Sequence, residues 1–138
     1  MAFADAQSGA VILYGETEAR ILLAGTVIKG DAVGFGSSGW VRALATVATA
    51  IQMRCTAAED GLAGQTITAY FGTTIIGGGR FSGGTAGSAL YVAEGTDSGK
   101  YTETAPSTTG DVTTIIGEVL TPTMAVVFPQ KNTQSVAT

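Results

Sequence analysis

The chain has no histidine, only one cysteine among 138 residues, and a charged fraction of 13%. Without histidine it lacks the side chain most often used for acid–base chemistry near neutral pH, which is also the commonest metal ligand. Cys55 cannot form an intrachain disulfide and has no histidine to activate it, so we expect a small buried apolar residue there. We therefore predict no catalytic, cofactor-binding or metal-binding residues, and a protein that is not an enzyme.

Long hydrophobic runs and clustered positive charge are also missing. No apolar run approaches the roughly 18 residues that span a bilayer, and the first nine residues lack the basic and apolar regions of a signal peptide. The net charge is −4, and the seven basic residues are scattered along the chain. Binding to nucleic acid or to an acidic membrane needs a concentrated positive field, so we expect neither partner, and synthesis in a cytosol.

Glycine and apolar residues are abundant instead. The 20 glycines cut a chain that is 45% hydrophobic into short apolar runs. Short β-prone runs separated by glycine turns are typical of a compact all-β protein. We predict a small single-domain β-barrel or sandwich of short strands with an extended N-terminal arm.

Three segments follow from this pattern. Residues 1–9 are predicted to form an N-terminal arm, residues 10–128 the β domain and residues 129–138 a C-terminal tail. The clearest hairpin joins strands at 32–35 and 40–43 through the glycine and serine residues between them. The alanine-rich segment 44–58 is ambiguous between helix and strand, and its alternation favours a strand over 50–57.

Two further motifs have ordinary structural interpretations. The run Gly77-Gly78-Gly79-Arg80 superficially resembles a phosphate-binding loop, but no Lys-Ser/Thr pair follows it. We interpret it as a flexible or bulged connection between strands. Glu16 and Glu18 would share one face of a strand, and a solvated face is favoured over a pair of hydrolytic carboxylates.

The order of several motifs resembles a known family. These motifs are KGDAVGF (29–35), GW (39–40), AEDGLAGQ (58–65), GTAGSALYV (84–92), a turn at 99–101, PSTTGD (106–111) and IGEVLTPTMAVVF (116–128). Together they resemble the small capsid cement, or head decoration, proteins of tailed bacteriophages. Related modules occur in phage head fibres and in some tail-fibre or baseplate pieces.

The resemblance implies a structural virion protein on the outer surface of a phage capsid, made in the host cytoplasm. Such proteins commonly assemble as homotrimers and clamp neighbouring copies of the major capsid protein. Their N-terminal arm often adds a strand to a capsid sheet, which here would make Phe3, Val11, Ile12 and Leu13 the shell contacts. The alternative for this N-terminal segment is a frayed terminus.

Two other functions compete with capsid cementing. The Thr/Gly-rich segments at 73–88 and 95–110 are compatible with a receptor- or glycan-binding module of a head or tail fibre. A small hydrolase would have to rely on carboxylates such as Glu16, Glu18 or Asp60. The copy number in purified particles separates cement from fibre, and loss of activity on substitution of a carboxylate would identify an enzyme.

Overall fold

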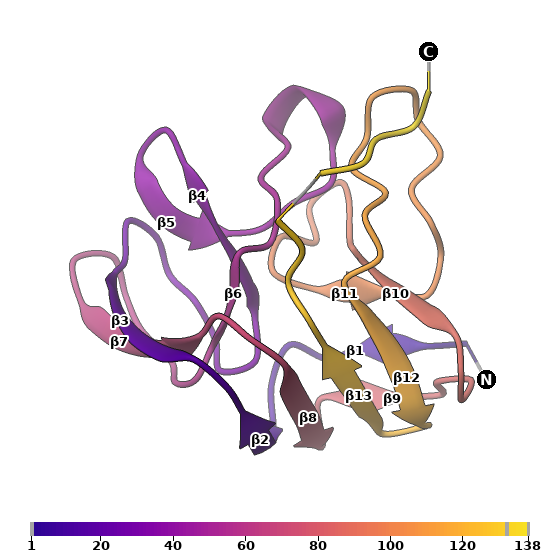
Figure 1. The fold of residues 1–138 in the computed structure, drawn as a ribbon, viewed down its shortest axis with the longest axis horizontal. Helices are drawn as coiled ribbons and strands as arrows, with labels where there is room; N and C mark the ends of the chain where they lie inside the picture. Colours follow the sequence, from indigo (N-terminus) through magenta and orange to yellow (C-terminus); the bar gives the residue numbers. More distant parts are fainter. Residues whose placement is uncertain (1, 132, 138) are drawn as a thin grey trace.

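Three antiparallel sheets make up the fold in the computed structural model, which describes residues 2–131 and 133–137. Figure 1 shows a five-stranded sheet on one side of the molecule and a six-stranded sheet on the other. The described residues contain one short 3₁₀ helix, η1, and no α-helix. The prediction of an all-β fold is confirmed, and the sheets of the described residues form no closed barrel, which is consistent with the sandwich alternative.

The elements follow one another along the chain as short strands. Their bounds are β1 (Ala4–Asp5), β2 (Ala10–Gly15), β3 (Glu18–Leu22), β4 (Ala32–Gly36), β5 (Gly39–Arg42), η1 (Val47–Thr49), β6 (Cys55–Ala57), β7 (Thr66–Tyr70), β8 (Thr74–Gly78), β9 (Phe81–Ser82), β10 (Ala89–Val92), β11 (Tyr101–Thr102), β12 (Gly117–Thr121) and β13 (Met124–Val127).

The five-stranded sheet has the order β3-β7-β6-β4-β5. The predicted hairpin is confirmed as β4–β5, where Gly36 and Gly39 pair across a two-residue turn. An isolated bridge joins Leu23, directly after the edge strand β3, to Trp40 of β5 at the opposite edge, without a continuous ladder between these two strands. Inward side chains of this sheet, including Ile21, form one hydrophobic cluster, hereafter the five-stranded cluster, whose members are Ile21, Leu23, Val27, Val33, Cys55, Ala57, Ile67 and Ala69.

The six-stranded sheet has the order β11-β10-β12-β13-β8-β2. Its inward side chains, Ala32 of the other sheet and several residues of connecting segments form a second cluster, hereafter the six-stranded cluster: Ala32, Ala43, Ala45, Met53, Ile76, Phe81, Leu90, Val92, Tyr101, Val112, Ile116, Val119, Ala125 and Val127. Neighbouring residues of a strand point to opposite faces. Ala32 and Val33 of β4 consequently belong to different clusters, so this strand has buried side chains on both faces.

The two ends of the chain pack against the domain. Ala4 and Asp5 pair with β9, which forms the two-stranded sheet. Near the other end, Ser135 bridges to Val112 and the Val136 N–H donates to the Asp111 carbonyl. Of the predicted arm and tail, residues 1, 132 and 138 lie outside the described residues.

The strand prediction for 50–57 was mostly wrong. Only Cys55–Ala57 forms a strand, while η1 occupies Val47–Thr49. A buried carboxylate explains this local structure, because Asp111 Oδ1 accepts a hydrogen bond from the Val47 N–H at 2.8 Å. The glycine run also differs from the prediction, because Gly77 and Gly78 belong to β8 instead of an inter-strand loop.

Candidate functional site

A buried arginine sits where the N-terminal segment meets both sheets. The Arg80 side chain is fully buried, and its Nη1 lies 2.9 Å from Asp31 Oδ1. Its Nε lies 2.8 Å from Asp5 Oδ1, an ion pair without the alignment of a hydrogen bond. Asp31 also pairs with Arg42 at 2.7 Å. Buried charges are tolerated when they are paired in this way.

Backbone carbonyls and aromatic rings complete the surroundings of Arg80. Its Nη1 donates to the Lys29 carbonyl at 3.0 Å, and its Nη2 donates to the Gly99 carbonyl at 3.1 Å. The guanidinium carbon lies 5.6 Å from the Tyr101 ring centroid. Burial alone would lower the pKa of Arg80, but Asp5, Tyr101 and Asp31 outweigh it and raise that pKa. Arg80 therefore remains charged and ties distant segments of the chain together.

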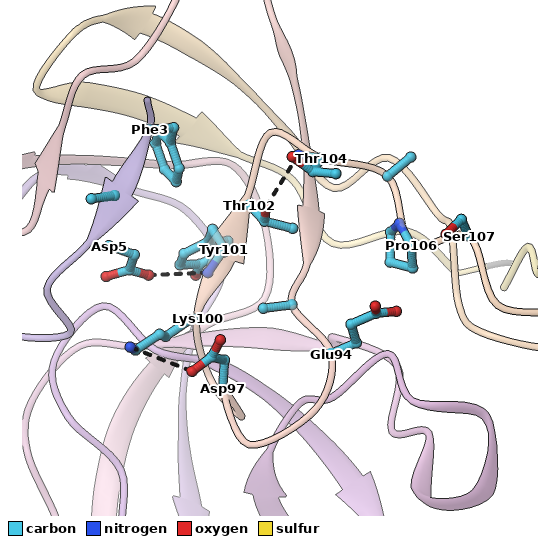
Figure 2. Close-up of a pocket in the computed structure, with 13 residues that line it drawn as sticks. Phe3, Asp5, Glu94, Asp97, Lys100, Tyr101, Thr102, Thr104, Pro106 and Ser107 are labelled. Atoms are coloured by element: carbon cyan, nitrogen blue, oxygen red, sulfur yellow. Dashed lines mark hydrogen bonds and ion pairs between the residues drawn. The ribbon is translucent and has the colours of Figure 1, made fainter. Parts of the chain in front are cut away.

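An open cleft of about 440 Å³ lies beside this buried cluster (Figure 2). Phe3, Asp5 and Tyr101 line one part of it, and the Asp5 carboxylate accepts the Tyr101 N–H at 3.0 Å. Asp97 and Lys100 form an ion pair of 3.6 Å at another part of the lining.

Glu94 lies at the cleft as an exposed carboxyl. A hydrogen bond with Asp111 is the largest cause that raises the pKa of Glu94, followed by its partial desolvation and the negative charge of Asp111. The cleft offers hydrogen-bonding groups, but its carboxylates lack the arrangement of a nucleophile and its base. Across residues 2–131 and 133–137, no group of three or more His, Cys, Asp or Glu side chains is placed to hold a metal ion.

The outward face of the six-stranded sheet is almost uncharged. Cross-strand pairing aligns Glu118 with Val126, Val126 with Ile75, and Ile75 with Tyr14. Around this row lie other apolar side chains that point away from the core: Val11, Leu13, Ala89, Tyr91, Leu120 and Met124. Glu118 is the one charged residue on this face among the strand residues described. We call this outward side of the six-stranded sheet the outer face.

The four predicted shell-contact residues have different environments. Phe3 packs against Phe81 with ring centroids 5.5 Å apart, and Ile12 packs against the six-stranded cluster. Val11 and Leu13 instead belong to the outer face and are 47% and 54% exposed. They lie on β2, which pairs with β8 along one side only and forms an edge of the sheet. The structure therefore brings Val11 and Leu13 together at a surface and places Phe3 and Ile12 against the interior.

Sequence analysis missed the roles of Arg80 and Asp31. Asp31 closes a turn with its side chain, because its Oδ2 accepts the Ile28 N–H at 2.8 Å. It is also fully buried and binds two arginines. The only sequence signal was the position of Arg80 directly before the apolar Phe81, which does not reveal a partner 75 residues away. Cys55 is buried as predicted, and burial raises the pKa of its thiol to about 12.

Comparison with known proteins found no matching family model, no matching curated protein and no matching solved structure. Within the part of the chain that the structure describes, no helix has the length and apolar character needed to cross a membrane.

Proposed function

We propose that this chain is a structural virion protein that binds the outer surface of a phage capsid as a homotrimer and stabilises the lattice of the major capsid protein. The observation that carries the proposal is the outer face of the six-stranded sheet. Its apolar side chains are half-buried or exposed and are accompanied by one carboxylate, and the most exposed of them are Val11, Leu13 and Tyr14. Such a surface is typical of one that another protein covers.

The edge strand β2 supplies the second element of the proposed contact. An exposed strand edge has unpaired backbone groups that can bind an extended segment of another chain. Val11 and Leu13 flank this edge with apolar side chains, so a capsid segment added beside β2 would gain both backbone hydrogen bonds and apolar burial. In this proposal the segment before β2 anchors the edge, because Asp5 is tied to Arg80.

Multivalency explains why such a modest surface suffices. Three copies that bind together at one site of the lattice act with a high effective concentration, so weak individual contacts combine into stable attachment. A cementing role also agrees with a chain that has few candidate catalytic side chains.

The decisive experiment is the stoichiometry of this chain in purified particles from its source, measured by quantitative mass spectrometry. We expect a copy number comparable to that of the major shell protein. A few copies per particle would contradict cementing and favour a fibre component, and complete absence would overturn the virion role.

A variant pair tests whether the outer face is the contact. Leu13→Glu places a charge on this face and should abolish incorporation into particles while the chain still folds. Leu62→Glu is the matched control, because Leu62 is 60% exposed and lies outside the six-stranded sheet. Equal incorporation of both variants would show that the outer face is not the docking surface.

A further inference from the structure

A second hollow, of about 480 Å³, lies beside the five-stranded sheet. It is found where the chain passes this sheet after leaving β13. Its lining combines two aromatic rings, a proline and three long polar side chains: Trp40, Phe71, Pro129, Arg54, Gln130 and Lys131. We call it the aromatic groove. It is separate from the outer face and from the cleft beside Tyr101.

The rings of the aromatic groove meet nearly at right angles. The Trp40 and Phe71 ring centroids are 5.5 Å apart with an angle of 86° between the ring planes. Phe35, which is 64% exposed, lies 5.1 Å from Trp40 on the β4–β5 hairpin. Aromatic faces carry partial negative charge, so they pack well against the C–H groups of a saturated ring.

The charged residues that line the aromatic groove, Arg54 and Lys131, are both positive, whereas the net charge of the chain is −4. Arg54 Nη1 donates to the carbonyls of Gln130 and Lys131, each at 3.0 Å, which fixes the guanidinium beside the groove. Only Nη1 is used in these bonds. No carboxylate of the described residues lies within 4.0 Å of the Arg54 or Lys131 cations. The remaining donors of a held guanidinium suit a carboxylate.

We propose that the aromatic groove binds a sugar ring that carries a carboxylate, of the uronic acid class. The ring packs on Trp40 and Phe71, and its carboxylate pairs with Arg54 and Lys131. A volume of about 480 Å³ falls within the roughly 300–1,000 Å³ that small-molecule sites span, so the groove has room for a single sugar ring. The site does not depend on the capsid role, and particle incorporation does not report on it.

Trp40 is the only tryptophan of the chain, so the groove contains its own spectroscopic probe. We would titrate the full chain with D-glucuronate at constant ionic strength and follow Trp40 fluorescence and the indole N–H resonance. A ligand of this size with a few contacts should bind with a Kd on the order of 1 mM. D-glucose and acetate separate the contributions of the ring and the carboxylate, and each should bind at least about tenfold more weakly.

Three variants locate the site. Arg54→Gln should weaken glucuronate binding about tenfold, because it removes a charge-assisted pair, and Arg54→Lys should restore part of the loss. Lys131→Gln should weaken binding several-fold without touching the bonds that Arg54 makes to the backbone. Arg20→Gln is the matched control, since it removes an exposed cation outside the groove, and it should leave the Kd unchanged.

Four results would overturn the proposal. No saturable change of the Trp40 signals up to about 50 mM glucuronate would remove the site. An equal response to acetate would indicate an anion contact without ring recognition, and an acidic tripeptide that binds as well as glucuronate would indicate a peptide groove. Trp40 signals that change with protein concentration alone would assign the groove to a second copy of the chain.

Discussion

The two large sheets bury comparable kinds of residues but are assembled in opposite ways. The five-stranded sheet takes all its strands from residues 18–70, an uninterrupted part of the chain. The six-stranded sheet pairs β2, near the N-terminus, with β8, which itself pairs with β13 near the C-terminus. Contacts between residues far apart in sequence carry a larger loop-closure cost. The six-stranded sheet is therefore the part that requires the whole chain.

Charge is also distributed unevenly along the chain. Residues 81–128 contain five acidic residues and one lysine, so their net charge of −4 equals that of the whole chain. The acidic side chains of the first 80 residues are nearly balanced by arginine and lysine. Arg80 lies at the boundary between these two parts of the sequence. It binds Asp5, which precedes both large sheets, and Asp31, which lies directly before β4 of the five-stranded sheet. One ion cluster therefore couples the sheet built from a continuous segment to the sheet built from distant segments.

The largest loss of stability should come from removal of the Arg80 charge that holds the ion cluster together. Arg80→Met keeps the volume but leaves the Asp5 and Asp31 carboxylates buried with reduced compensation, which costs about 3–5 kcal/mol. Urea unfolding measures this loss, and amide exchange should accelerate in both sheets. Arg20→Met is the control, because the exposed Arg20–Glu59 pair contributes at most about 1 kcal/mol. A loss below 1 kcal/mol for Arg80→Met would show that the sheets do not depend on this cluster.

A smaller effect should follow a change in β4, the strand shared by both clusters. An added Cβ at Gly34 would lie 2.1 Å from the Gln52 carbonyl oxygen, so Gly34→Ala forces the backbone apart and should cost about 1–3 kcal/mol. Gly25→Ala is the control, because its φ lies outside the left-handed region and the added Cβ would make an ordinary contact of 3.5 Å with Val41. Thermal unfolding that lowers Tm as much for Gly25→Ala as for Gly34→Ala would contradict the close approach.

The decline of the unfolding free energy at alkaline pH tests the five-stranded cluster, because Cys55 belongs to that cluster. Burial raises the pKa of Cys55 to about 12 from an ordinary value of 9.0. Between these values the unfolded thiol ionises and the folded one does not, so the Cys55 contribution falls by about 1.4 kcal/mol per pH unit as pH rises. Below pH 9 this contribution is fully present. Cys55→Ala should flatten the decline, measured as urea unfolding between pH 8 and 10. Identical slopes would contradict a buried thiol.

The smallest change in stability should come from the acidic residues of segment 81–128, which include Glu94 and Asp111. Asp111 raises the pKa of Glu94, so the protonated form of Glu94 is favoured in the folded state, and the paired charges oppose folding when both are ionised. Glu94→Gln should raise Tm slightly at pH 7, and the gain should disappear as pH falls and Glu94 becomes protonated. Glu118→Gln is the control on a carboxylate of β12. An equal gain for both variants would indicate a general charge effect and no specific pair.

Much of the β structure could be predicted because it depends on local pattern. The β4–β5 hairpin follows from two β-prone runs around Gly and Ser, and β7 follows from the alternation of Ile67 and Ala69 with threonine. Segment 44–58 was less predictable, since the N–H of Val47 at η1 is satisfied by Asp111, which is distant in sequence. The shell-contact prediction stays a prediction: Val11 and Leu13 are exposed, and Phe3 packs against Phe81.

Residue patterns along the chain are enough to predict short strands in an all-β fold, the burial of Cys55 and the scarcity of residues for acid–base chemistry. These features depend on periodicity and composition, which act over a few residues. The folded arrangement is needed to see that Arg80 and Asp31 are buried together, that the outer face carries a row of apolar side chains with one carboxylate, and that Trp40 and Arg54 line one groove. Each of these joins segments through side-chain contacts that no local pattern specifies.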